Sequence, residues 1–255
     1  MAEENTIVFK SEQISTFTER GFQPIVETFC SMLNDNIGAP IDTLEEKSVQ
    51  QLRDGIEFPF MKGVFKVYAM DKCEKITLSN CIMMDRILAC AVTAIPADDY
   101  ELPIPVLEWS ETENVISVLV DFIPAVDLAM RQDYREKYLD PLEQYWTKYK
   151  DFPGMEPNRF AWTRQLLSPY YLCAHISKED EENKKLCVDI FKDYLGVWLG
   201  LWQNAEPVKD EQSKKYSISR KAQIRKIFRD NDEGAKSMRQ MIGEETVDAI
   251  LLCNF

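Results

Sequence analysis

The sequence of 255 residues contains a single histidine, His175, and only nine glycines. One histidine is too few for a His-rich metal site, and we find no Gly-rich phosphate loop, no GxSxG motif and no P-loop lysine. The seven cysteines form no CxxC pair and no iron–sulfur spacing. Most of them lie in apolar runs, which favours reduced core thiols over a disulfide framework. The sequence therefore predicts a protein that binds no metal and carries no bound cofactor.

Membrane and nucleic-acid functions are also disfavoured. No run approaches the roughly 18 uncharged apolar residues of a membrane span, and residues 1–6 lack the basic and apolar regions of a signal peptide. The formal net charge is -13 at pH 7, whereas phosphate binding depends on Lys and Arg. We expect a soluble, intracellular monomer that binds neither membrane nor nucleic acid. Its compartment would be the cytoplasm, or the plastid stroma if a transit peptide has been removed.

A helix followed by short strands makes up the first half of the chain. Apolar residues recur at helical spacing over 22–36, which predicts a helix. Five strand-like runs separated by short polar turns follow, over residues 64–69, 75–79, 87–95, 102–109 and 115–122. Links this short indicate antiparallel neighbours, because parallel crossovers need about a dozen residues or more. Several strands are apolar on both faces, so we expect layers on both sides of the sheet.

The second half of the chain is mainly helical. Amphipathic patterns predict helices over 132–149, 179–204 and 234–252, and a further strand over 166–175. No repeat or low-complexity linker interrupts this order, so we expect one domain spanning residues 1–255. Helices before and after an antiparallel sheet predict an α/β fold of the α+β type, a three-layer α/β/α sandwich with a central antiparallel sheet.

Glu108 is the first candidate for a functional residue. It lies near the end of the apolar, Pro-bounded run 102–109, between two other strand-like runs. A carboxylate on a covered sheet face is costly unless it is paired, hydrated or used in proton chemistry. Desolvation there would raise its pKa toward working pH, as a general acid requires. The alternative is a surface residue at the edge of the sheet.

Several short motifs occur in an order and spacing typical of a known family. They lie within residues 58–255 and cover 85–92, 100–108, 118–124, 133–142, 167–172, 206–207, 229–232 and 242–245. Each motif is weak alone, and the joint order carries the match. On these motifs the chain resembles the ferredoxin-dependent bilin reductases, which include the red chlorophyll catabolite reductases.

The resemblance implies a linear tetrapyrrole bound between an antiparallel sheet and the C-terminal helices. Members of the family carry no metal or flavin, take single electrons from ferredoxin and supply protons from side chains through radical intermediates. The family's central-strand acid falls on Glu108, and its second acid, in an Asn-Asp pair, falls on Asp232. The resemblance therefore implies that Glu108 and Asp232 are catalytic and that Asn231 binds substrate. For Asp232, an N-cap of the last helix is the alternative.

Three features depart from the family pattern. Ala89 stands where some members have a histidine, which speaks against the branch that uses a His–Asp pair. Glu233 follows the Asn-Asp pair, where a basic residue or a proline is usual. The overall acidity is also unfavourable for docking an acidic ferredoxin.

One segment is strongly basic in this acidic chain. From Lys214 to Arg229 there are seven basic residues and no acidic one. Such a patch attracts an acidic electron donor, and it offers charge-assisted hydrogen bonds to the two propionates of a bilin. We expect ferredoxin docking at Lys214, Lys215, Arg225 and Lys226, and substrate binding at Arg220, Lys221 and His175. The alternative is a solvated loop for the run and a structural role for the histidine.

The leading function is the ferredoxin-dependent reduction of a linear tetrapyrrole, such as biliverdin or a chlorophyll-derived bilin. The alternative is a non-catalytic bilin carrier or sensor, and the presence of both acids favours the enzyme because a carrier needs no proton donor. A third reading is an unrelated α/β/α protein whose motifs match by chance. The Trp198/Trp202 stripe and the methionines Met83 and Met84 predict core packing, with a flat apolar substrate wall as the alternative.

Overall fold

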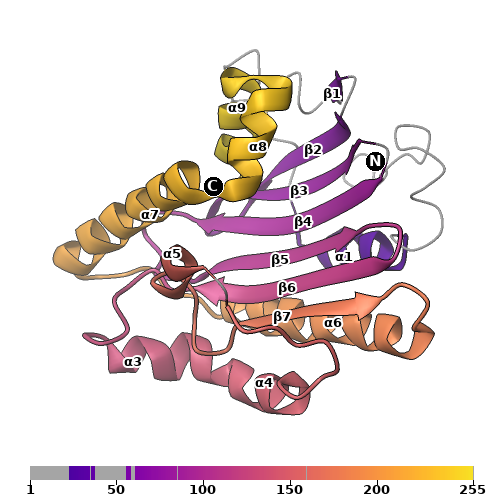
Figure 1. Ribbon diagram of the computed structural model, residues 1–255. Helices are drawn as coiled ribbons and strands as arrows, with labels where there is room; N and C mark the ends of the chain where they lie inside the picture. Colours follow the sequence, from indigo (N-terminus) through magenta and orange to yellow (C-terminus); the bar gives the residue numbers. More distant parts are fainter. Residues whose placement is uncertain are drawn as a thin grey trace, which may run out of the picture.

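The computed structural model describes residues 23–34, 36–37, 56–58, 61–84, 86–158 and 160–254. Within them, one antiparallel sheet contains seven strands in the order in which they occur along the chain (Figure 1). They are β1 (Ile56–Phe58), β2 (Met61–Met70), β3 (Cys73–Met83), β4 (Ile87–Pro96), β5 (Ile104–Glu111), β6 (Val115–Ile123) and β7 (Leu172–Ser177). The consecutive order of β2 to β6 follows from their short links, which make each strand the antiparallel neighbour of the one before it.

Helices cover both faces of this sheet. On one face, α1 and α6 pack together behind the strands in Figure 1; they span Gln23–Asn34 and Glu181–Gln203. The other face carries α5 (Ala161–Arg164), α7 (Glu211–Asn231), α8 (Glu233–Ile242) and α9 (Glu244–Asn254). The predicted three-layer α/β/α arrangement around an antiparallel sheet is therefore confirmed.

The connection from β6 to β7 contains the helical stretch expected over residues 132–149, but its winding changes three times. The successive segments are α3 (Gln132–Tyr134), a π-helical turn (Arg135–Leu139), a 3₁₀ turn (Asp140–Leu142) and α4 (Glu143–Tyr149). Pro141 lies in the 3₁₀ turn. Because proline has no N–H to donate, the regular α-helical ladder cannot continue through it.

The largest core layer lies between the sheet and the α1/α6 pair. Phe191 of α6 contacts Phe29 of α1 and Trp109 of β5, with ring centroids 5.3 and 6.1 Å apart. Trp198 is fully buried in this layer and donates its indole N–H to a backbone carbonyl at 3.1 Å. The tryptophan stripe is therefore core packing and not a substrate wall, whereas the core packing expected of the methionines is wrong for Met84, which is exposed. The opposite face carries two smaller clusters, one under α8 and α9 and one under α5 and α7.

The predicted C-terminal helix and the basic segment both differ from the structure. The helix expected over 234–252 is interrupted at Gly243, whose φ of 86° and ψ of 158° belong to a region that is essentially restricted to glycine. The chain therefore ends in two helices, α8 and α9. The basic run is not a loop, because it lies within helix α7, whose N-cap Asp210 accepts a hydrogen bond from Ser213 N at 2.7 Å.

The seventh strand is shorter than expected and extends the sheet past Phe122. Of the predicted run 166–175, only Leu172 onward pairs with β6. Ser168 donates its backbone N–H to the Asp121 side chain and not to a neighbouring strand. The continuous sheet shows no division of the chain near Phe122. One domain over 1–255 remains a prediction, since residues 1–22 and 38–55 lie outside the described part.

Candidate active site

Glu108 lies on a central strand and faces the helices α7 to α9. On β5, Leu107 and Trp109 belong to the core layer under α1 and α6, so the alternating Val106 and Glu108 point to the other face. Glu108 pairs with Ala91 of β4 on one side and with β6 on the other. The alternative of a residue at the edge of the sheet is therefore wrong.

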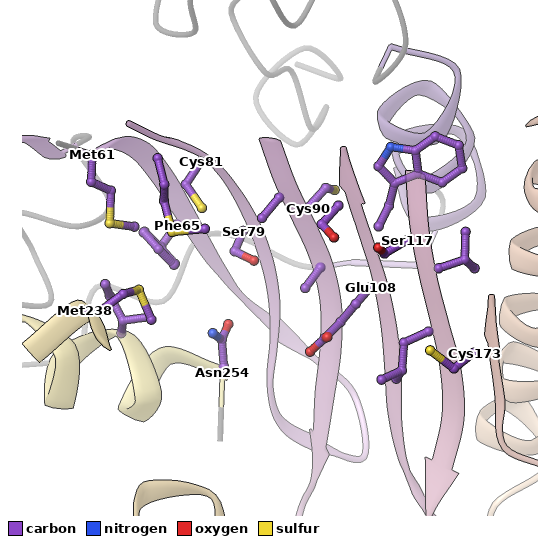
Figure 2. A pocket seen from close by; sticks show the side chains of 18 of the residues that line it. Met61, Phe65, Ser79, Cys81, Cys90, Glu108, Ser117, Cys173, Met238 and Asn254 are labelled. Atoms are coloured by element: carbon purple, nitrogen blue, oxygen red, sulfur yellow. The ribbon is translucent and has the colours of Figure 1, made fainter. Parts of the chain in front are cut away.

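Among the described residues, two hollows open on this face of the sheet. The first has a volume of about 430 Å³ and is named the thiol hollow after its sulfur-bearing lining, which includes Met61, Cys81, Met83, Cys173 and Met238. The second has a volume of about 370 Å³ and is named the aromatic hollow after Phe160, Trp162, Tyr171 and Phe228. Both hollows are lined by Glu108, Leu119, Cys173 and His175. Glu108 therefore lies at their junction, and Figure 2 shows its carboxyl group projecting from the sheet into the thiol hollow.

The surroundings of Glu108 shift its protonation. The side chain is exposed to the hollow, so solvent reaches it. The pKa of its carboxyl is nevertheless raised to about 7, first by desolvation in the hollow and second by the negative charge of Asp232. A bound ligand would displace the remaining water and favour the protonated form further. Glu108 thus has the protonation behaviour of a general acid near neutral pH.

Asp232 lies both at a helix terminus and beside a hollow. Its Oδ1 accepts hydrogen bonds from Gly234 N at 2.8 Å and Ala235 N at 3.2 Å, which caps α8. The same residue lines the aromatic hollow and acts electrostatically on Glu108. The N-cap alternative therefore describes part of its role and does not exclude a role in chemistry. The structure brings the two candidate acids to one site.

His175 is the third sequence-predicted residue at this site. It lies on β7 and lines both hollows, and its Nδ1 is 3.6 Å from Glu156 Oε1. Glu156 also lines the aromatic hollow, so a negative charge stands beside the only histidine. Binding of a propionate by His175 stays a prediction.

Three other residues expected to bind substrate lie away from both hollows as the described residues define them. Asn231 donates its amide to a helix carbonyl at 2.9 Å, and Arg220 donates to a carbonyl of the segment after α5 at 3.2 Å. Lys221 is buried, with its Nζ 2.9 Å from Pro96 O and 2.6 Å from Asp98 Oδ1. Arg220 and Lys221 thus tie α7 to other segments, Asn231 bonds within its own helix, and the geometry does not favour the predicted contact of the three with substrate.

The four predicted docking residues lie on α7. Three of them form ion pairs with carboxylates, Lys214 with Asp99, Arg225 with Glu74 and Lys226 with Asp230. Arg225 makes two bonds, at 2.8 and 3.0 Å, to the carboxylate of its partner. Lys215 is exposed. The basic segment is thus an ordered helix whose charge is partly balanced, and ferredoxin docking there stays a prediction.

Two site residues escaped the sequence analysis. Asp121 of β6 is fully buried on the same face as Glu108, and its pKa is raised to about 6 by burial, against the lowering effect of its hydrogen bonds from Ser168. Tyr171 lines the aromatic hollow. A charged residue inside the apolar run 115–122 was a signal for Asp121 of the same kind as that for Glu108, whereas nothing in the sequence distinguished Tyr171 from its neighbour Tyr170.

Two kinds of feature are absent from the described residues. These contain no group of His, Cys, Asp or Glu side chains arranged to hold a metal ion. They also contain no helix long and apolar enough to cross a membrane. The six cysteines that the structure describes form no disulfide with one another.

The fold and the site together define a class of protein: an antiparallel sheet lies between two helical layers, and two carboxyl groups face hollows on one side of the sheet. Known structures share this fold. The structure is similar in fold to phytochromobilin synthase from tomato, solved in complex with biliverdin, with a TM-score of 0.75. The match covers 91% of this chain and 82% of that one at 18% sequence identity.

The sequence comparisons identify the family. The model of the ferredoxin-dependent bilin reductases matches residues 66–251, and the chain belongs to this family. A curated relative, 15,16-dihydrobiliverdin:ferredoxin oxidoreductase of Nostoc punctiforme, is 24% identical over 159 residues. That alignment covers 61% of this chain and 62% of the relative, which is less than two thirds of its length.

Proposed function

We propose that this protein reduces a linear tetrapyrrole with single electrons from a docked ferredoxin and protons from Glu108 and Asp232. The observation that carries the proposal is the position of Glu108, at the junction of two hollows and with a pKa raised to about 7. A carboxyl group that is half protonated near neutral pH donates protons efficiently. Asp232 lies on the wall of the same site and supplies a second carboxyl group.

The proposed reaction adds two electrons and two protons to each double bond that is reduced. Ferredoxin delivers the electrons one at a time, so a radical forms between the two transfers. A proton from a carboxyl group neutralises the added negative charge, and the resulting carboxylate takes a proton from solvent before the next cycle. Raised pKa values at such carboxyl groups are the means by which enzymes match proton donors to their task.

The shape and lining of the site suit a large, flat and mostly apolar ligand. The hollows have volumes of about 430 and 370 Å³ and meet at Glu108. Binding pockets for small molecules are typically about 300–1,000 Å³ in volume and have mainly apolar walls with a few placed polar groups. The tomato phytochromobilin synthase was solved in complex with biliverdin, and the Nostoc punctiforme relative is named for dihydrobiliverdin. The described lining contains no Lys or Arg, so His175 is its candidate cation for a propionate.

The remaining expectations form part of the same proposal. Electrons enter from ferredoxin at α7, where Lys215 is exposed beside three charge-paired basic residues. The protein acts as a single-domain monomer without a bound cofactor, in the cytoplasm or the plastid stroma. A net charge of -13 disfavours nucleic acid as a partner.

A two-stage experiment tests the proposal. Biliverdin is first titrated into the purified protein, and the visible spectrum of the bound pigment is followed. Reduced ferredoxin is then supplied without oxygen. The proposal predicts saturable binding followed by bleaching or a shift of the visible band. Saturable binding without any later change would identify a carrier or sensor, and the absence of binding would refute both functions.

The variant Glu108→Gln is the informative mutant in this experiment. It keeps the size of the side chain and loses the ionisable carboxyl proton, so binding stays close to wild type while reduction stops or stalls at a radical. Glu113→Gln is the matched control, because Glu113 is exposed in the turn that follows β5. Normal turnover by Glu108→Gln would show that this carboxyl group is structural.

A further inference from the structure

A buried carboxylate holds the turn that leads into β7. Asp121 has no exposed surface and lies two strand positions from Leu119, which lines both hollows. Its two oxygens accept hydrogen bonds from Ser168, one from the backbone N at 2.8 Å and one from Oγ at 2.5 Å. A buried carboxylate with two hydrogen bonds to one residue fixes the position of that residue.

Ser168 in turn orders the two tyrosines that follow Pro169. Its Oγ accepts a hydrogen bond from Tyr170 N at 3.1 Å, and its carbonyl oxygen accepts one from Tyr171 N at 3.4 Å. The two side chains then take opposite directions. Tyr170 donates its hydroxyl proton to Asp140 Oδ1 at 2.7 Å, whereas Tyr171 lines the aromatic hollow.

The Tyr171 hydroxyl is a proton donor without a strong acceptor among the described residues. Its side chain is hydrogen-bonded to that of Cys173, and a thiol sulfur accepts hydrogen bonds only weakly. Burial and the nearby carboxylates of Asp121 and Glu108 hold the pKa of this phenol well above its usual range. The phenol therefore keeps its proton at any working pH, and it exchanges a weak partner for a strong one at little cost.

We propose that Tyr171, held in place by the Asp121–Ser168 pair, donates a hydrogen bond to an oxygen atom of the ligand in the aromatic hollow. The inference rests on the proposed function and adds a binding residue to it. A linear tetrapyrrole offers two kinds of acceptor oxygen, the lactam carbonyls of its terminal rings and the carboxylates of its propionates. The aromatic walls formed by Trp162 and Phe228 suit the flat ring that carries such an oxygen.

The variant Tyr171→Phe removes the proposed donor and keeps the ring. Its affinity is measured by spectroscopic titration with biliverdin and with biliverdin dimethyl ester, in which both propionates are masked. Loss of one neutral hydrogen bond weakens binding about three- to tenfold, and loss of a bond to a carboxylate weakens it more. A loss with both ligands identifies a lactam carbonyl as the acceptor, and a loss with the free acid alone identifies a propionate.

The neighbouring Tyr170→Phe is the matched control. It removes a hydroxyl from the same turn, but that hydroxyl bonds to Asp140 and is absent from the described lining of both hollows. We therefore expect the affinity of Tyr170→Phe for both ligands to stay within twofold of wild type, that is within about 0.4 kcal/mol. Unchanged affinity of Tyr171→Phe for both ligands would overturn the inference while leaving the proposed function intact. Absence of bilin binding by the wild type would overturn both.

Ser168→Ala tests whether the pair acts through Tyr171. The single variant loses the Oγ contacts with Asp121 and with Tyr170 N, and we expect its bilin affinity to fall. In the Tyr171→Phe background the same change should have no further effect on affinity, because the donor that it positions is already gone. A general loss of stability would instead weaken binding equally in both backgrounds, and this outcome would refute the positioning role of Ser168 and Asp121.

Discussion

Two substitutions at Asp232 separate its part in helix capping from its part in chemistry. Asn is as good an N-cap as Asp, so Asp232→Asn keeps the bonds to the N–H groups at 2.8 and 3.2 Å and removes the ionisable carboxyl group. We expect its melting temperature to stay close to wild type. Asp232→Ala removes the cap as well, which costs about 1 kcal/mol and lowers the melting temperature by about 2–4 °C.

The activity of the same two variants carries the chemical part of the prediction. Both should reduce bilin more slowly than wild type, since both lack the second carboxyl group. In Asp232→Asn the negative charge that raises the pKa of Glu108 is also absent, so the pH above which reduction slows should move downward. Asp210→Ala is the matched control, because Asp210 caps α7 through Ser213 N at 2.7 Å and lines neither hollow as described.

For Asp210→Ala we expect a loss of stability similar to that of Asp232→Ala, with normal reduction of bilin. Asp232→Asn with wild-type activity and an unchanged pH profile would refute the chemical role and leave Asp232 as a helix cap alone.

Two further predictions concern pH and salt. Folding favours the protonated form of Glu108, so the contribution of Glu108 to the free energy of unfolding falls as pH rises from about 4.5 to about 7. In denaturant titrations, Glu108→Gln should therefore gain stability relative to wild type across this pH window. A constant difference would contradict the raised pKa. Turnover should fall with ionic strength, because the Debye length is about 10 Å at 0.1 M salt and shorter above it. The triple substitution of Lys214, Lys215 and Lys226 by Gln should raise the ferredoxin requirement and spare bilin affinity. Substitution of Lys185 and Lys192 on α6 by Gln should change neither quantity. Equal behaviour of the two sets of variants would place the docking face elsewhere.

The meander of strands and the position of Glu108 could be predicted from the sequence. Short polar links fix antiparallel neighbours without any knowledge of packing. Burial of a single acid inside an apolar, Pro-bounded run costs free energy unless the acid is paired, hydrated or used in proton chemistry, and this cost singled out Glu108 in the sequence. Asp121 is likewise a single acid inside an apolar run, 115–122, so the same rule applies to it.

Other features depend on contacts between distant parts of the chain. Lys221 lies in a run of charges that predicts a solvated surface, yet Pro96 O and Asp98, more than a hundred residues away, hold it in the interior. The lining of the aromatic hollow combines β5, the segment before β7 and the end of α7. No local sequence pattern predicts that these three segments lie side by side. The break at Gly243 was readable as a glycine within a helical pattern, but its backbone angles were not.

The pH dependence of reduction in a single turnover tests the central claim most directly. Bilin is bound in advance, excess reduced ferredoxin is added without oxygen, and the decay of the visible band is recorded between pH 5.5 and 9, values chosen to extend about 1.5–2 units on either side of the Glu108 pKa of about 7. The rate should be highest where Glu108 is protonated and should fall above a midpoint at or above about 7, since the ligand displaces water from the carboxyl group. Glu108→Gln should show no such midpoint. A rate that is independent of pH in the wild type, or a midpoint that persists in Glu108→Gln, would contradict the assignment of Glu108 as the proton donor.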